Sequence, residues 1–236
     1  MIAEDISYSQ DGLTMSGRFV APDGAPGLPG ILLVHGAHGL NGFILGIAER
    51  LAGQGFATLA LDLWGGREQI ADPARIGEKL GACVRNPAGW MARVEAAHAQ
   101  LAARPEVDRT RIGALGYCFG GTSVLEYARI GGAVAGVVSF HGGLDLVSDD
   151  WGAQSRGPVL ICSGHADPMA KAEDISRLTA AMSAAGVAWE LDLYGGVKHA
   201  FTEPDAPGRP PFAAYDARAD RRSWAAMSAF FNDIFS

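Results

Sequence analysis

The stretch from Gly116 to Gly121 has the residue types of a nucleophile on a tight strand-to-helix turn. It reads Gly-Tyr-Cys-Phe-Gly-Gly, which is the G-x-S-x-G pattern with Cys118 in place of serine. Glycines are needed on both sides because the crossing backbones leave no room for side chains. At the first turn of a helix, unpaired N–H groups would favour a thiolate. Cys118 is therefore predicted to be a nucleophile, with a small buried residue in a tight turn as the alternative.

A nucleophile of this kind needs an acid and a histidine that follow it in the chain, in that order. Asp167 lies in the loop after one expected strand, and His199 lies in the loop after the next. We expect His199 to take the proton of the Cys118 thiol and Asp167 to orient the imidazole. The alternatives that stay open are Asp145 as the acid and His165 as the base, whereas His98, inside an expected helix, is expected to be structural.

Two backbone N–H groups are expected to stabilise the negative charge that develops on the substrate oxygen. One is the N–H of Phe119, directly after the nucleophile. The second is expected from Gly36 or Ala37, in the loop after the first parallel strand, with Ala37 preferred. His35 and His38 flank this loop, but no carboxylate lies near them, so neither a metal nor a cofactor is predicted.

Aromatic and charged residues near these loops are candidates for contact with a substrate. Trp64, Tyr117 and Phe201 are predicted to line an apolar pocket, with ordinary core packing as the alternative. Arg75 and Arg85, in an irregular segment, are candidate contacts for a substrate anion, with solvated surface positions as the alternative.

The elements that position these residues alternate between short apolar runs and amphipathic segments. This alternation is typical of an α/β fold with a mostly parallel central sheet and helices on both faces. Two antiparallel strands joined near Asp11-Gly12 are expected first. Further strands are expected over 30–35, 57–61, 112–115, 135–140, 159–163 and 188–193, and helices over 43–53, 91–104, 121–129, 171–185 and 222–235. Residues 64–89 show only a weak helical pattern, and the segment 204–211 is expected either to overhang the site or to connect His199 to the last helix.

The composition excludes several classes of protein. Of 236 residues, 48% are hydrophobic and 19% are charged, which is enough apolar material for a large core and excludes a disordered chain. A net charge of −7 argues against binding to nucleic acid or an anionic membrane. The acidic start lacks the features of a signal peptide, and the apolar runs are shorter than a membrane span. One domain over 1–236 in the cytoplasm is therefore predicted, and oligomeric state is not predicted.

At these residues the sequence resembles the dienelactone hydrolase family over nearly its whole length. The motifs that carry the resemblance are HGAHGL at 35–40, ALDLW at 60–64, GYCFGG at 116–121, GHAD at 164–167 and HAF at 199–201. The resemblance implies an α/β-hydrolase fold and a Cys-His-Asp triad. It also implies hydrolysis of a small ester or lactone through an acyl-enzyme thioester.

The sequence departs from that family at two places. Members of the family carry a Glu in the loop near Gly36 and an Arg shortly after the catalytic histidine, which holds a substrate carboxylate. No carboxylate stands near Gly36 here, and Glu203 follows His199 where the Arg is expected. The resemblance therefore implies the reaction class more strongly than a dienelactone substrate.

A redox or binding role for Cys118 on a hydrolase scaffold is the alternative function. An accessible thiol of low pKa would serve oxidation as well as hydrolysis, and Cys83 is the candidate partner. The three cysteines, Cys83, Cys118 and Cys162, show no spacing typical of disulfides or zinc sites. A complete, ordered set of acid and base favours hydrolysis, because a redox sensor needs neither.

Overall fold

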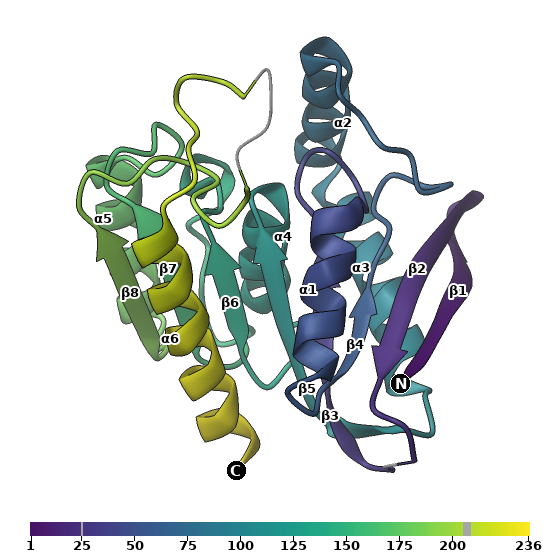
Figure 1. Cartoon of the computed structure of the whole chain (residues 1–236). Coiled ribbons are helices and arrows are strands. Elements are labelled where there is room, and N and C mark those ends of the chain that lie inside the picture. The colour runs from purple at the N-terminus through teal and green to yellow at the C-terminus, as the bar shows by residue number, and fades with distance from the viewer. Residues whose placement is uncertain (25, 205–208) are drawn as a thin grey trace. The chain divides into compact units, whose positions relative to one another are not determined.

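A long strand, β5 (Val107–Tyr117), marks the division of the chain. The computed structural model describes residues 1–24, 26–204 and 209–236. They form two compact units, Met1–Ala114 and Leu115–Ser236, which meet in sequence inside β5. Figure 1 shows the elements of both units. A single domain over 1–236 stays a prediction.

The strands of the first unit begin with a hairpin. β1 (Ile2–Gln10) pairs antiparallel with β2 (Leu13–Ala21), and β2 pairs antiparallel with β4 (Ala57–Ala60). β4 is parallel to β3 (Leu28–Val34). Asp11 and Gly12, which join the hairpin, both have positive φ, as a tight turn between twisted strands requires. The expected hairpin is confirmed.

Helices cover both faces of these strands (Figure 1). α1 (Gly42–Ala52) packs on β2 and β4, and α3 (Pro87–Ala102) packs on β1, β3 and β4. α3 begins four residues earlier than expected because the Asn86 side chain caps it by accepting the N–H of Gly89.

The segment 64–89 contains a helix that the sequence analysis did not assign. α2 (Pro73–Arg85) begins at Asp72, whose side chain accepts the N–H of Ala74. Proline in the first turn is compatible with a helix because its missing N–H would have no partner there. Only Cys83 of α2 is buried, although the apolar residues Ile76, Leu80, Cys83 and Val84 are spaced to share one face of the helix. Gly77 and Gly81 lower the helix propensity of this segment, which is why the sequence shows the helix only weakly.

Asp62 fixes the chain directly after β4. Its carboxylate accepts the backbone N–H groups of Ser16, Trp64, Gly65 and Arg67 at 2.8–3.1 Å. The side chain is fully buried, so these four bonds replace its hydration. They hold the turn that carries Trp64.

The second unit has three parallel strands after the end of β5. β6 (Val137–Phe140) pairs with β7 (Val159–Gly164), and β7 pairs with β8 (Trp189–Tyr194). α4 (Phe119–Arg129) packs on β6, and α5 (Ala172–Ala184) packs on β8. α6 (Ala217–Phe235) packs on β7, and it begins before the expected residue 222 because Asp216 caps its first N–H groups. A short 3-10 helix, η1 (Leu144–Leu146), follows β6.

Within the described residues, none of the helices combines the length and the apolar character that crossing a bilayer requires. The cytoplasmic location stays a prediction.

Candidate active site

Cys118 is the single residue between β5 and α4. Its backbone has a φ of 53° and a ψ of −121°, a conformation that L-residues rarely adopt. The turn is held because the Cys118 carbonyl accepts the N–H groups of Gly121 and Thr122, while the Cys118 N–H donates to the Phe140 carbonyl at 3.0 Å. Cys118 is partly exposed, whereas every residue of α4 is buried. The turn therefore lifts the sulfur out of the packed helix start.

The glycines around Cys118 are required by space. A Cβ at Gly116 would lie 2.0 Å from the Gly120 carbonyl oxygen, and a Cβ at Gly121 would lie 2.6 Å from the Ser139 hydroxyl. Contacts this short do not occur between real atoms, so β5 and α4 cross at a distance that only glycine permits. The expected reason for the motif is confirmed at Gly116, whose added Cβ would meet the backbone at the start of α4, whereas Gly121 lies against Ser139 of β6.

The structure brings Cys118, His199 and Asp167 together in one hydrogen-bonded row. Nε2 of His199 lies 3.3 Å from the Cys118 sulfur, and Nδ1 lies 2.7 Å from a carboxylate oxygen of Asp167. The other Asp167 oxygen accepts the N–H of Met169 at 2.9 Å. His199 and Asp167 are only 4% and 2% exposed, so water is largely excluded from this row.

The surroundings of His199 favour its charged form. Burial by itself would lower the pKa of the imidazole, but the Cys118 sulfur and the hydrogen-bonded Asp167 carboxylate raise it to about 10. An imidazolium at this distance would stabilise negative charge that develops on the sulfur.

The loop that carries His199 is fastened by the segment that follows it. The N–H of His199 donates to the Phe212 carbonyl, and the N–H of Ala214 donates back to the His199 carbonyl, both at 3.1 Å. Arg209 donates to the carbonyls of Ala200, Glu203 and Pro204. Residues 205–208 lie outside the described part of the chain, so whether the 204–211 segment overhangs the site stays open. The described residues of the segment after 208 therefore hold the loop that carries His199, which we call the base loop.

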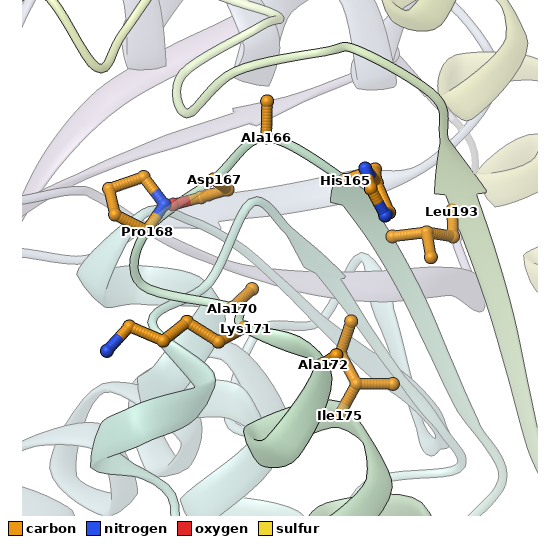
Figure 2. Close-up of a pocket in the computed structure, with 9 residues that line it drawn as sticks. All are labelled: His165, Ala166, Asp167, Pro168, Ala170, Lys171, Ala172, Ile175 and Leu193. Atoms are coloured by element: carbon orange, nitrogen blue, oxygen red, sulfur yellow. The ribbon is translucent and has the colours of Figure 1, made fainter.

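The rival acid and base lie elsewhere in the same unit. Burial and the nearby Asp174 raise the pKa of Asp145, and the carboxylate that bonds His199 is that of Asp167. His165 lines an open hollow of about 380 Å³ that is formed in part by the loop carrying Asp167 (Figure 2). Among the described residues, those that line this hollow do not include Cys118 or His199. His98 is buried on α3 in the first unit, as expected of a structural histidine.

In the first unit, the loop after β3 is shaped by hydrogen bonds from side chains. His35 donates from Nδ1 to the Gly36 carbonyl at 2.7 Å, and its Nε2 accepts the N–H of Leu63. The N–H of Ala37 belongs to the same trans peptide as that carbonyl and points the opposite way. The Ala37 carbonyl in turn accepts the indole N–H of Trp64 at 3.1 Å. Gly36 and Ala37, like Phe119, stay predicted oxyanion donors.

Ring nitrogens of His35 and His38 make hydrogen bonds to the backbone. Burial lowers the pKa of His35 to about 4, and both of its ring nitrogens are occupied by the backbone. Nδ1 of His38 lies 2.8 Å from the Ile70 carbonyl oxygen. Among the described residues, no three or more His, Cys, Asp or Glu side chains are grouped so that they could hold a metal ion.

The predicted substrate contacts all have partners within the protein. Trp64, Tyr117 and Phe201 are buried, and Tyr117 stacks on Phe140 with ring centroids 4.8 Å apart. Arg75 forms ion pairs with Glu68 and Glu78. These contacts are part of the packing, and contact with a substrate stays a prediction.

Sequence reasoning missed His141, a buried histidine directly after β6. Its ring lies edge-on to the His199 ring, with centroids 5.2 Å apart. Its position at the end of a strand, like the positions of Asp167 and His199, is the signal that could have identified it.

Comparison with known proteins identifies the family. The family model described as "Dienelactone hydrolase family" matches residues 15–235. The chain belongs to the dienelactone hydrolase family. The predicted fold class, an α/β-hydrolase, and the predicted enzyme class, a hydrolase of carboxylic esters or lactones, are confirmed.

Three proteins of known sequence or structure are similar to this member of the dienelactone hydrolase family. A probable 2-oxo-3-(5-oxofuran-2-ylidene)propanoate lactonase of Bradyrhizobium sp is 31% identical and covers 80% of each chain. A putative carboxymethylenebutenolidase of Methylorubrum extorquens is 29% identical over 94% of this chain and 77% of its own. The crystal structure of a dienelactone hydrolase-like promiscuous phosphotriesterase from metagenomic libraries is 34% identical. It covers 99% of this chain and 98% of its own, with a TM-score of 0.93.

The packing at Gly116 predicts the effect of one added methyl group. Gly116→Ala is expected to lose several kcal/mol of unfolding free energy, about 3 or more, or to prevent folding, because backbone blocks the new Cβ. Gly46→Ala is the matched control, since Gly46 lies within α1 with open space around its Cβ. There alanine should be neutral or stabilising by up to about 1 kcal/mol. Urea unfolding compares the two, and equal stability would contradict the crossing distance.

Proposed function

We propose that Cys118, His199 and Asp167 are the catalytic triad of a thiol hydrolase that cleaves small esters or lactones. The observation that carries the proposal is the unbroken row of contacts from the sulfur through the imidazole to the carboxylate, 3.3 Å and 2.7 Å long. Its chain order, nucleophile then acid then histidine, agrees with a nucleophile on a strand-to-helix turn. The nearly complete burial of Asp167 and His199 makes these contacts strong.

The first half-reaction forms a thioester. The Cys118 thiolate attacks the carbonyl carbon, and the carbonyl electrons move to the oxygen, which the Phe119 N–H and a donor from Gly36 or Ala37 stabilise. When the tetrahedral intermediate collapses, the carbon–oxygen bond breaks and His199 gives its proton to the leaving oxygen. In a lactone that oxygen stays attached as a hydroxyl group of the acyl chain.

The second half-reaction returns the enzyme to its starting state. His199, now neutral, takes a proton from water as the water oxygen attacks the thioester carbon. Collapse releases the carboxylic acid and restores the thiolate beside an imidazolium. Asp167 keeps Nδ1 of His199 as the donor throughout, so that Nε2 faces the reacting atoms.

The redox alternative has less support. Burial raises the pKa of Cys83 and of Cys162, so neither is a ready thiolate partner for an oxidised Cys118. An Asp–His pair directed at the sulfur also has no purpose in a thiol sensor.

Substitution of the triad is expected to abolish ester hydrolysis. Cys118→Ala and His199→Asn should lower kcat/KM for a short-chain p-nitrophenyl ester by at least about 10³-fold, because the nucleophile and its base act as a unit. Cys83→Ala removes a thiol from α2 and should retain the wild-type rate. A folded wild type that is inert toward a panel of esters and lactones while Cys118 oxidises reversibly would contradict the proposal in favour of the redox role.

A phosphotriester is proposed as a second, weaker class of substrate. The observation that favours it is the likeness over almost the full length to a dienelactone hydrolase-like promiscuous phosphotriesterase. Attack of the Cys118 thiolate on phosphorus would form a sulfur–phosphorus bond and expel an aryl oxide, and water would then release a phosphodiester. Diethyl p-nitrophenyl phosphate should release nitrophenolate with wild type and not with Cys118→Ala. Equal release by both proteins, or no release by a wild type that cleaves esters, would refute this activity.

A further inference from the structure

A second histidine lies against the triad and takes no part in the proposed chemistry. His141 is completely buried, and its ring packs edge-on against the His199 ring at 5.2 Å and an interplanar angle of 70°. Phe201 contacts the same ring edge-on at 5.3 Å. The backbone of His141 has a φ of 39°, a left-handed conformation that costs free energy in a residue with a side chain. Glycine would adopt this backbone conformation without strain, so the presence of histidine suggests that the imidazole has a function at this position.

The two ring nitrogens of His141 have partners on two different elements. Nδ1 accepts the backbone N–H of Cys118 at 3.2 Å, a group shared with the Phe140 carbonyl. Nε2 lies 2.8 Å from the Thr202 hydroxyl oxygen. A backbone N–H can only donate, so Nδ1 carries no proton. The proton of the neutral ring is therefore on Nε2 and is donated to Thr202.

The surroundings of His141 favour its neutral form, whereas those of His199 favour the charged form. Burial, then the charge of His199, and also Arg209 lower the pKa of His141 well below its usual value. Protonation would also place a hydrogen on Nδ1, against the Cys118 N–H. Of the titratable groups near the ring, Cys118 and His199 belong to the triad, Tyr117 contributes a ring contact at 5.8 Å, and Arg209 is positive. A neutral His141 leaves His199 as the only imidazole at the site that exchanges a proton.

We propose that His141 is a positioning residue that ties the backbone of Cys118 to Thr202 and thereby holds the His199 ring in line with the sulfur. Thr202 lies three residues after His199, on the same loop. The rigid imidazole thus connects the element that carries the nucleophile to the loop that carries the base. This inference rests on the proposed roles of Cys118 and His199.

The matched pair Thr202→Val and Thr202→Ser tests the connection. Valine keeps the volume of threonine but cannot accept the Nε2–H of His141, whereas serine keeps the hydroxyl oxygen. We expect Thr202→Val to lower kcat for a p-nitrophenyl ester by about 10- to 100-fold while KM changes little, because small displacements of reacting groups are costly. Thr202→Ser should recover most of the wild-type kcat.

Alkylation of Cys118 by iodoacetamide gives a readout that does not depend on turnover. With His199 charged beside it, the sulfur should react rapidly at neutral pH in wild type, and Cys118→Ala supplies the background from the two buried thiols. Thr202→Val should move the pH dependence of alkylation to higher pH, and Thr202→Ser should restore it. If Thr202→Val does not fold, His141→Asn replaces it, since asparagine tolerates positive φ and keeps an acceptor near Cys118 while losing the Thr202 contact.

The outcomes separate this inference from the proposed function. If Cys118→Ala is inactive and Thr202→Val matches wild type in kcat and alkylation profile, the triad stands and the positioning role is wrong. If Thr202→Val and Thr202→Ser lose activity equally, the loss is due to altered packing, and the hydrogen bond between His141 and Thr202 does not contribute to catalysis. If Cys118→Ala keeps the wild-type rate, the proposed function is wrong, and the alkylation profiles alone decide whether His141 positions the two groups.

Discussion

The left-handed backbone at Cys118 is the constraint on which the candidate site depends. One residue must reverse the chain between β5 and a helix that is buried on every side, and this is possible only because Gly116 and Gly121 let the backbones approach. The result places a sulfur at a helix start, within 3.3 Å of an imidazole. The strain of the turn is balanced by the hydrogen bonds that its carbonyl and N–H groups make, including the bond to His141.

Two histidines at the same site are driven to opposite charge states by their partners. His199 faces a sulfur and a carboxylate, which raise its pKa against the effect of burial, while burial, then the charge of His199 and also that of Arg209 lower the pKa of His141. Environments that separate the pKa values of neighbouring groups assign their roles, one as the proton carrier and the other as a fixed acceptor and donor.

The sequence predicted the parts of this site that depend on local patterns. The glycine spacing around Cys118 predicted the turn, and the strand-end positions of Asp167 and His199 predicted the two residues that the structure places in a hydrogen-bonded row with Cys118, where Asp145 and His165 do not lie. His141 was missed because its role appears only when β6, α4 and the base loop pack together. The helix α2 was missed for a different reason: Asp72 and Pro73 form a recognisable start, but Gly77 and Gly81 lower the helix propensity of the segment that follows.

Detection of the acyl-enzyme tests the central claim most directly. Wild type mixed with excess p-nitrophenyl ester and quenched in acid should show one acyl group by mass spectrometry, located on the Cys118 peptide and removed by hydroxylamine. The same adduct should accumulate when deacylation is slowed and should be absent from Cys118→Ala. A burst of nitrophenolate equal to the enzyme concentration with an unmodified Cys118 peptide would contradict nucleophilic attack by this thiol.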